Sequence, residues 1–102
     1  MAGRVTNDWL AARFAGAPAE LVQRASDFVG DVGSTTTPEA LSRAASRALR
    51  AALASATDRS AALDLLAADA LVTVALAAQV ETDPAGLERF ARDLRGRDGG
   101  LP

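Results

Sequence analysis

The sequence predicts an all-α protein, a compact bundle of about five helices. Apolar residues recur at spacings of three and four along most of the chain, which is the period of an amphipathic helix. Alanine, the strongest helix former, fills many of these positions, and proline and glycine fall between the apolar runs. A chain of 102 residues has the size of one domain, so we expect a single helical domain over residues 1–102.

The first two helices are predicted over residues 7–15 and 18–31. Asn7 is a suitable N-cap for the first helix, and Gly16 is a suitable stop. The second helix begins at Pro18, because proline is favoured in a first turn. Its apolar residues fall on one stripe: Leu21, Val22, Ala25, Phe28, Val29 and Val32.

The next two helices are predicted over residues 38–56 and 58–81. Thr37, which precedes a proline and a glutamate, is a strong start signal for the third helix, and Thr57 or Asp58 caps the fourth. The link between them is so short that they should form an antiparallel hairpin, with 58–81 as the central helix. Small residues on the third helix should let its neighbour approach closely. The expected buried face is Leu41, Ala44, Ala45, Ala48, Leu49, Ala52 and Leu53.

A fifth helix is predicted over residues 84–95, because Thr-Asp-Pro at 82–84 stops one helix and starts the next. We expect residues 1–6 and the glycine-rich tail 96–102 to be flexible termini. We expect no β-strand, since the one run with β-propensity, 71–74, lies within a long stretch of helix formers.

The composition excludes most catalytic and cofactor chemistry. The chain has no Cys, His or Lys, and every basic residue is an arginine. It therefore has no thiolate nucleophile, Cys-based zinc site, Ser-His-Asp triad or Schiff-base lysine. Only carboxylates, hydroxyls and arginines remain. We expect a protein that is not an enzyme and that binds no metal and no cofactor.

Charge and hydropathy predict the cellular location of the protein and whether it binds nucleic acid or a membrane. A net charge of −2 creates no field that attracts nucleic acid. The first residues lack the apolar core of a signal peptide. Residues 61–80 are apolar enough to span a bilayer, but the two aspartates within them are costly at membrane depth. We therefore expect a cytoplasmic protein with no nucleic-acid partner and no membrane partner.

These two aspartates lie on different faces of the fourth helix. At about 100° per residue, Asp64 lies on a small, polar side that suits solvent or close contact with another helix, whereas Asp69 lies among the bulkiest apolar residues. A carboxylate buried there must be paired, hydrogen-bonded or protonated. Asp69 and Thr73, one turn on, are therefore the predicted buried polar residues. Either Asp69 forms a structural ion pair with Arg13 or Arg24, or it is a functional carboxylate in a pocket.

Three arginines recur at helical spacing opposite the alanine face of the third helix. These residues, Arg43, Arg47 and Arg50, should form an exposed basic ridge. The ridge is either an ordinary solvated helix face or a docking surface for an acidic partner. A nucleic-acid partner is disfavoured, because the chain has no lysine and no aromatic residue lies beside the three arginines. The three arginines and Asp64 are the predicted partner-facing residues.

Three functions are compatible with these patterns. The leading prediction is a non-catalytic protein that binds another protein, as an accessory subunit or as a homo-oligomer. The reason is that the chain has more apolar helix surface than five short helices readily cover. The alternative is a helical bundle that binds a small molecule in an apolar pocket. An enzyme that uses Asp69 as acid or base is the third, and it lacks a second catalytic group. In the small-molecule alternative, the apolar pocket would lie near Trp9, Phe14, Phe28 and Phe90.

Overall fold

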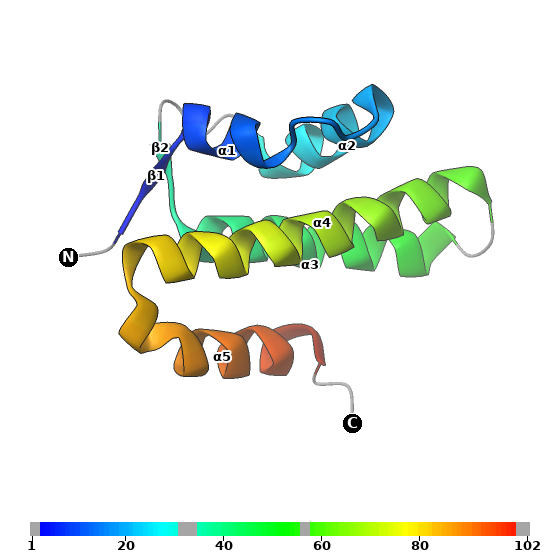
Figure 1. Cartoon of the computed structure of the whole chain (residues 1–102). Helices are drawn as coiled ribbons and strands as arrows, with labels where there is room; N and C mark the ends of the chain where they lie inside the picture. The colour runs from blue at the N-terminus through cyan, green and yellow to red at the C-terminus, as the bar shows by residue number, and fades with distance from the viewer. Residues whose placement is uncertain (1–2, 31–34, 56–57, 100–102) are drawn as a thin grey trace.

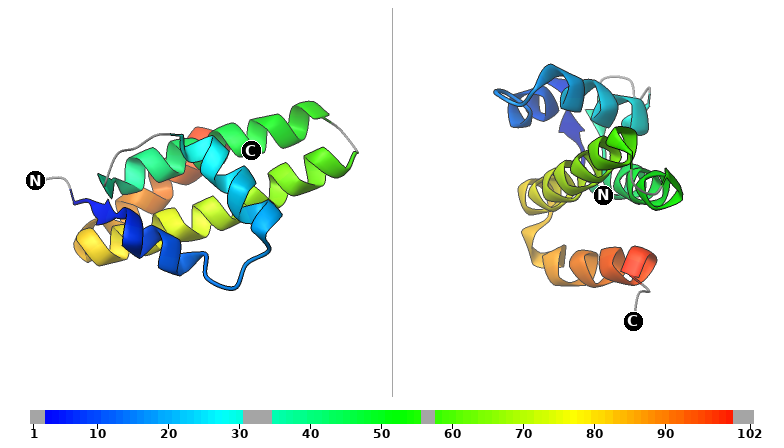
Figure 2. Two further views of the ribbon diagram at one scale, coloured as in Figure 1. Left: turned by 90° about the horizontal axis from the view of Figure 1, so that it is seen from above. Right: turned by 90° about the vertical axis from the view of Figure 1, so that its right-hand side faces the viewer.

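The fold is an all-α bundle of five α-helices, as the sequence predicts (Figure 1). The computed structural model describes residues 3–30, 35–55 and 58–99, without the side chains of residues 55 and 97–99. Figures 1 and 2 show three layers: the two N-terminal helices, a long helical hairpin in the middle, and the C-terminal helix on the opposite side.

The hairpin consists of α3 (Pro38–Ser55) and α4 (Arg59–Thr82), which run antiparallel and side by side, as predicted (Figures 1 and 2). Their seam is built from alanines: Ala45, Ala48 and Ala67 are each at most 1% exposed. Small side chains on both helices let the two backbones approach closely. The predicted alanine face of α3 is therefore confirmed, except that Leu49 is half-buried and Leu53, near the end of the helix, is 71% exposed.

Side-chain caps begin both hairpin helices. Thr37 Oγ1 accepts a hydrogen bond from the backbone N–H of Ala40 at 3.1 Å. Asp58 Oδ1 accepts one from the N–H of Ala61 at 2.8 Å. These bonds satisfy amide groups that have no partner inside the helix, and the start signals identified in the sequence are therefore confirmed.

The upper layer consists of α1 (Asn7–Arg13) and α2 (Ala19–Val29). Ala25 of α2 is 1% exposed and lies in the core cluster with alanines of both hairpin helices. The N-cap of α1 is Thr6 rather than Asn7, since Thr6 Oγ1 accepts from the N–H of Trp9 at 3.0 Å. Helix α2 ends before residue 31, because Gly30 takes a φ of 76° that ends the helical conformation.

A two-stranded pairing that the sequence analysis did not predict joins β1 (Val5–Thr6) to β2 (Thr35–Thr36). The strands are antiparallel, with Val5 opposite Thr36. The expectations of no strand and of a flexible segment 1–6 are therefore wrong for the described part, which begins at residue 3. Burial explains why this N-terminal segment has a defined conformation, because Val5 is 4% exposed and belongs to the core cluster of Val74.

The lower layer is α5 (Leu87–Gly99), which follows a single 3₁₀ turn, η1 (Pro84–Gly86). Phe90 and Leu94 bury its apolar stripe against the hairpin. The predicted flexible tail 96–102 is helical as far as Gly99, and its last three residues lie outside the described part. A glycine disfavours a helix by only about 1 kcal/mol, which does not stop α5 before the end of the described chain.

Candidate interaction surface

The buried carboxylate of α4 belongs to Asp64, not to Asp69. Asp64 is 5% exposed, and its carboxylate forms an ion pair with Arg24 of α2. The Arg24 guanidinium also donates to Ser60 Oγ at 3.3 Å, one turn earlier on α4. The prediction that Asp64 faces a partner is therefore wrong, because that side of α4 packs against α2 and the carboxylate is already paired.

The small side of α4 is buried because close helix packing selects small residues. Sequence reasoning placed the bulkiest side chains in the core, as is usual for large apolar residues. In this fold α2 and α3 press against α4 through alanines, so the alanine-rich side of α4 becomes the inner side. The bulky side is left on the outside, and it carries Asp69 with it.

Asp69 and Thr73 both lie on the exposed side of α4, so the prediction that they are buried is wrong. Thr73 Oγ1 donates to the backbone carbonyl of Asp69 at 3.0 Å, a bond within one helical turn. Within the described residues, the Asp69 carboxylate has no ion pair with either expected arginine. Arg24 is paired with Asp64, and Arg13 stacks over the Trp9 ring at 4.7 Å from its centroid.

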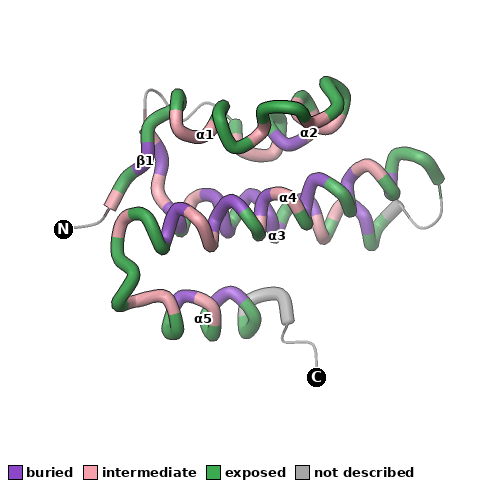
Figure 3. The backbone as a smooth tube through the Cα atoms, viewed as in Figure 1, coloured by how far each residue is buried: buried purple, intermediate pink, exposed green. Residues whose placement is uncertain are grey.

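The exposed strip along α4, which we call the outer face, is predominantly apolar. It lies opposite the buried side of the helix and consists of the exposed residues Ala62, Leu65, Leu66, Asp69, Thr73 and Val80 and the half-buried residues Leu76 and Ala77. Leu65 is 54% exposed, Leu66 is 56% exposed and Val80 is 49% exposed. Figure 3 shows exposed and half-buried stretches recurring along α4 between the buried ones. A helix that is apolar on all sides is normally covered on all sides, and here one side is open.

Such a strip differs from the scattered apolar residues of an ordinary surface. Single exposed leucines are common, whereas apolar side chains that follow one another along a helix mark an interaction surface. One member, Leu76, is partly buried against the core cluster of Val5, so the outer face is anchored to the core at that level. The signal present in the sequence was the excess of apolar helix surface, but sequence reasoning assigned it to the wrong side of α4.

The arginine ridge lies on α3, and all three of its side chains are exposed. Arg47 Nη2 donates to the backbone carbonyl of Phe28 at 2.6 Å, next to the end of α2. A cation at this position suits the partial negative charge of a helix C-terminus. Arg47 therefore has a structural contact, and a partner for Arg43 and Arg50 stays a prediction.

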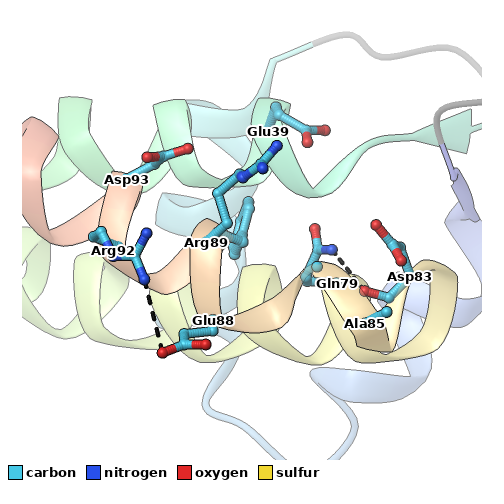
Figure 4. A pocket seen from close by; sticks show the side chains of 10 residues that line it. Glu39, Gln79, Asp83, Ala85, Glu88, Arg89, Arg92 and Asp93 are labelled. Atoms are coloured by element: carbon cyan, nitrogen blue, oxygen red, sulfur yellow. Dashed lines mark hydrogen bonds and ion pairs between the residues drawn. The ribbon is translucent and has the colours of Figure 1, made fainter.

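A polar depression of about 650 Å³ lies where η1 and α5 meet the start of α3 (Figure 4). Its charged lining is mixed: Glu39, Asp83, Glu88, Arg89, Arg92 and Asp93. Arg92 forms an ion pair with Glu88 at 3.7 Å, and Gln79 Nε2 donates to the carbonyl of Asp83 at 2.8 Å. Phe90 is the one aromatic residue in the lining. The depression is therefore not the apolar pocket that the small-molecule alternative requires.

The four aromatic residues are divided between two core clusters. Phe28 packs against the first cluster, Trp9 and Phe90 belong to the second, and Phe14 contacts both. Phe90 is buried, and the other three rings are half-buried. Among the described residues, no three acidic side chains come together in a way that could hold a metal ion.

Within the described ranges, α4 is the one helix long and apolar enough to cross a membrane by length and composition. Its most apolar window has a mean hydropathy of 1.9, and 44% of that window is buried. One such helix is weak evidence, because the core helix of a soluble protein passes the same test. The buried ion pair of Asp64 with Arg24 fits a core helix, and the absence of a membrane partner stays a prediction.

No family model matches this chain, and comparison with curated proteins and with solved structures gives no significant match.

Proposed function

We propose that this protein is a non-catalytic interaction protein that binds a protein partner on the outer face of α4. The observation that carries the proposal is the exposure of about half of each of Leu65, Leu66 and Val80, aligned on one side of the central helix. Full burial of such a side chain contributes about 1.5–3 kcal/mol. A partner that covers the strip would recover the part of this free energy that the isolated chain leaves unused.

The chemistry of the outer face also suits a protein partner. Asp69 is the one charged member among its eight residues, and the centres of protein interfaces are depleted in charged side chains. Thr73 is the second polar member, and a hydroxyl can both donate and accept a hydrogen bond. A strip of this kind, with two polar positions among apolar ones, can specify a binding register while most of its area remains apolar.

The carboxylates of α4 give less support to catalysis. Asp64, the buried one, is neutralised by Arg24. Asp69 is exposed, and among the described residues its carboxylate forms no hydrogen bond or ion pair with another side chain. A general acid or base needs a neighbouring group that shares the reaction with it.

The test is the size of the native complex. We expect the tagged chain, expressed at its natural level in its own host, to elute from gel filtration at a mass above that of the monomer. Leu66→Glu would place a charge in the middle of the apolar strip and should shift the chain towards the monomer. Circular dichroism and the melting temperature establish that the variant is folded.

A matched control places the same charge elsewhere. Ala54→Glu changes an exposed residue near the end of α3 on the side of the arginine ridge, and it should leave the complex intact. Equal elution of wild type and folded Leu66→Glu would contradict the proposal.

A further inference from the structure

We propose that the partner is a second copy of this chain, with the two α4 helices packed antiparallel through their outer faces. This inference rests on the proposed function and names its partner.

The spacing of the outer face is self-complementary in the antiparallel direction. Consider an antiparallel pair whose two-fold axis passes at the level of residue 71. A residue that lies a given number of positions before residue 71 in one copy then faces the residue that lies the same number of positions after residue 71 in the other copy. Every residue of the outer face then meets another residue of the outer face. The facing pairs are Ala62 with Val80, Leu65 with Ala77, Leu66 with Leu76, and Asp69 with Thr73. Larger side chains meet smaller ones in the first two pairs, which is how two helices interdigitate.

The polar centre of the strip selects this orientation. Across the two-fold axis, Asp69 of each copy faces Thr73 of the other. The Thr73 hydroxyl donates to the backbone carbonyl of Asp69 in its own chain, and in the pair it would turn this one hydrogen to the carboxylate of the other copy, a charged and therefore stronger acceptor. In a parallel pair in register, Asp69 would face Asp69, and two like charges would lose water together. The antiparallel pair is therefore the arrangement in which the polar residues satisfy each other.

The charges at the ends of α4 are complementary in the same orientation. Arg59 begins the helix, and its side chain is 86% exposed although it forms a surface ion pair with Glu20 at 3.2 Å. Glu81 and Asp83, both exposed, lie at the other end of the helix. An antiparallel pair places Arg59 of one copy beside Glu81 and Asp83 of the other, twice per dimer. It also sets the positive end of each helix dipole against the negative end of the other.

The area available predicts a weak dimer. The strip from Ala62 to Val80 is about 27 Å long, at 1.5 Å per residue. A single strip of helix surface of that length falls short of the roughly 800 Å² per partner of a standard interface. Helix α1 lies over the C-terminal half of α4 (Figure 1), so the two-fold axis carries it towards the N-terminal half of the other α4, where Leu65 is exposed. We expect dimerisation that depends on concentration in the micromolar range or above.

Single-cysteine cross-linking of the purified full chain tests the orientation, because the natural sequence has no cysteine. Ala62→Cys and Val80→Cys are small changes at exposed positions. In the antiparallel pair each cysteine faces the other variant's cysteine and lies about 27 Å along the helix from its own copy. A short bismaleimide should therefore cross-link the mixture of the two variants and neither variant alone. Ala54→Cys, on the far side of α3, measures cross-linking by random collision.

Sedimentation equilibrium of wild type and Leu66→Glu measures the association itself. The substitution should raise the dimer dissociation constant by roughly a hundredfold, because each dimer carries it twice. Cross-linking of each variant with itself would overturn the antiparallel orientation. A wild-type chain that stays monomeric up to near-millimolar concentration would overturn the second copy as the occupant. The proposed function would survive that result if the native complex still depends on Leu66, so the two failures are distinguishable.

Discussion

Arg24 of α2 pairs with the carboxylate of Asp64 on α4, and the same guanidinium donates to Ser60 one turn away. Glu20, one turn before Arg24, pairs with Arg59 at 3.2 Å, but on an exposed surface. The two ion pairs therefore join the same helices with different consequences. The exposed pair contributes little, because water screens it, whereas removal of one partner from the buried pair leaves a charge without compensation.

Arg24→Ala should lower the free energy of unfolding by about 2–4 kcal/mol, because it leaves the Asp64 carboxylate buried and unpaired. Urea denaturation of the purified protein measures this. The double variant Arg24→Met with Asp64→Leu should recover much of the loss, since it removes both charges. Asp69→Ala is the matched control on the exposed side of α4, and it should change stability by about 0.5 kcal/mol or less. An Arg24→Ala protein as stable as wild type would refute a structural role for the pair.

Ala48→Leu should destabilise the protein by about 3 kcal/mol. Ala48 is fully buried in the hairpin seam, and a larger side chain there would push the two backbones apart. Ala54→Leu, the same change at an exposed position of α3, should alter stability by about 0.5 kcal/mol or less. Thermal unfolding compares the two variants, and a tolerated Ala48→Leu would show that the seam is not closely packed.

Two glycine substitutions should change stability in opposite directions. Gly30→Ala should cost about 1–2 kcal/mol, because residue 30 has a φ of 76° that alanine adopts only with strain. Gly96→Ala should stabilise the protein by up to about 1 kcal/mol, because Gly96 lies within α5 with open space around it. Chemical denaturation measures both, and a stabilising Gly30→Ala would contradict the helix end described for α2.

Asp58→Ala should cost about 1 kcal/mol, because it removes the side chain that caps α4. Asp58→Asn is the control, since asparagine caps equally well without the charge. If the asparagine variant loses as much stability as the alanine variant, charge rather than capping explains the role of Asp58. Thermal unfolding distinguishes the two.

If α4 pairs with a second copy, Asp69→Leu should tighten the dimer and admit the parallel orientation, because it removes the like charges that would face each other there. A polar residue at an otherwise apolar interface specifies register at a cost in affinity. Sedimentation equilibrium should give a lower dissociation constant, and the Ala62→Cys and Val80→Cys variants made in this background should begin to cross-link with themselves. Unchanged affinity and an unchanged cross-linking pattern would place Asp69 outside the interface.

The helices could be predicted because their determinants are local. Thr37 and Asp58 begin helices through bonds to amides three residues on. The strand pair could not, because Val5 and Thr36 are far apart in sequence and two residues carry too little periodicity to recognise.

The candidate site was predicted less well than the fold. Periodicity correctly separated the two faces of α4, but which face lies inwards depends on what packs against it. The alanines of α2 and α3 decide that Asp64 is inside and that Leu66 is outside. The exposure of Arg43 and Arg50 was predictable because they lie opposite the apolar stripe of their own helix.

The pairing of Val5 with Thr36 closes a loop in the chain that contains both α1 and α2. The upper layer is thus fastened at its base by two strands of two residues and across the hairpin by the ion pair of Arg24. A single cut at Gly16, in the exposed connection between α1 and α2, would leave α2 covalently joined to the hairpin. The fragment before the cut would be held by β1, by the hydrogen bond of Arg4 to Thr35, and by the side chains of α1 and Phe14, so retention of this peptide after the cut measures directly how much binding free energy those few residues supply.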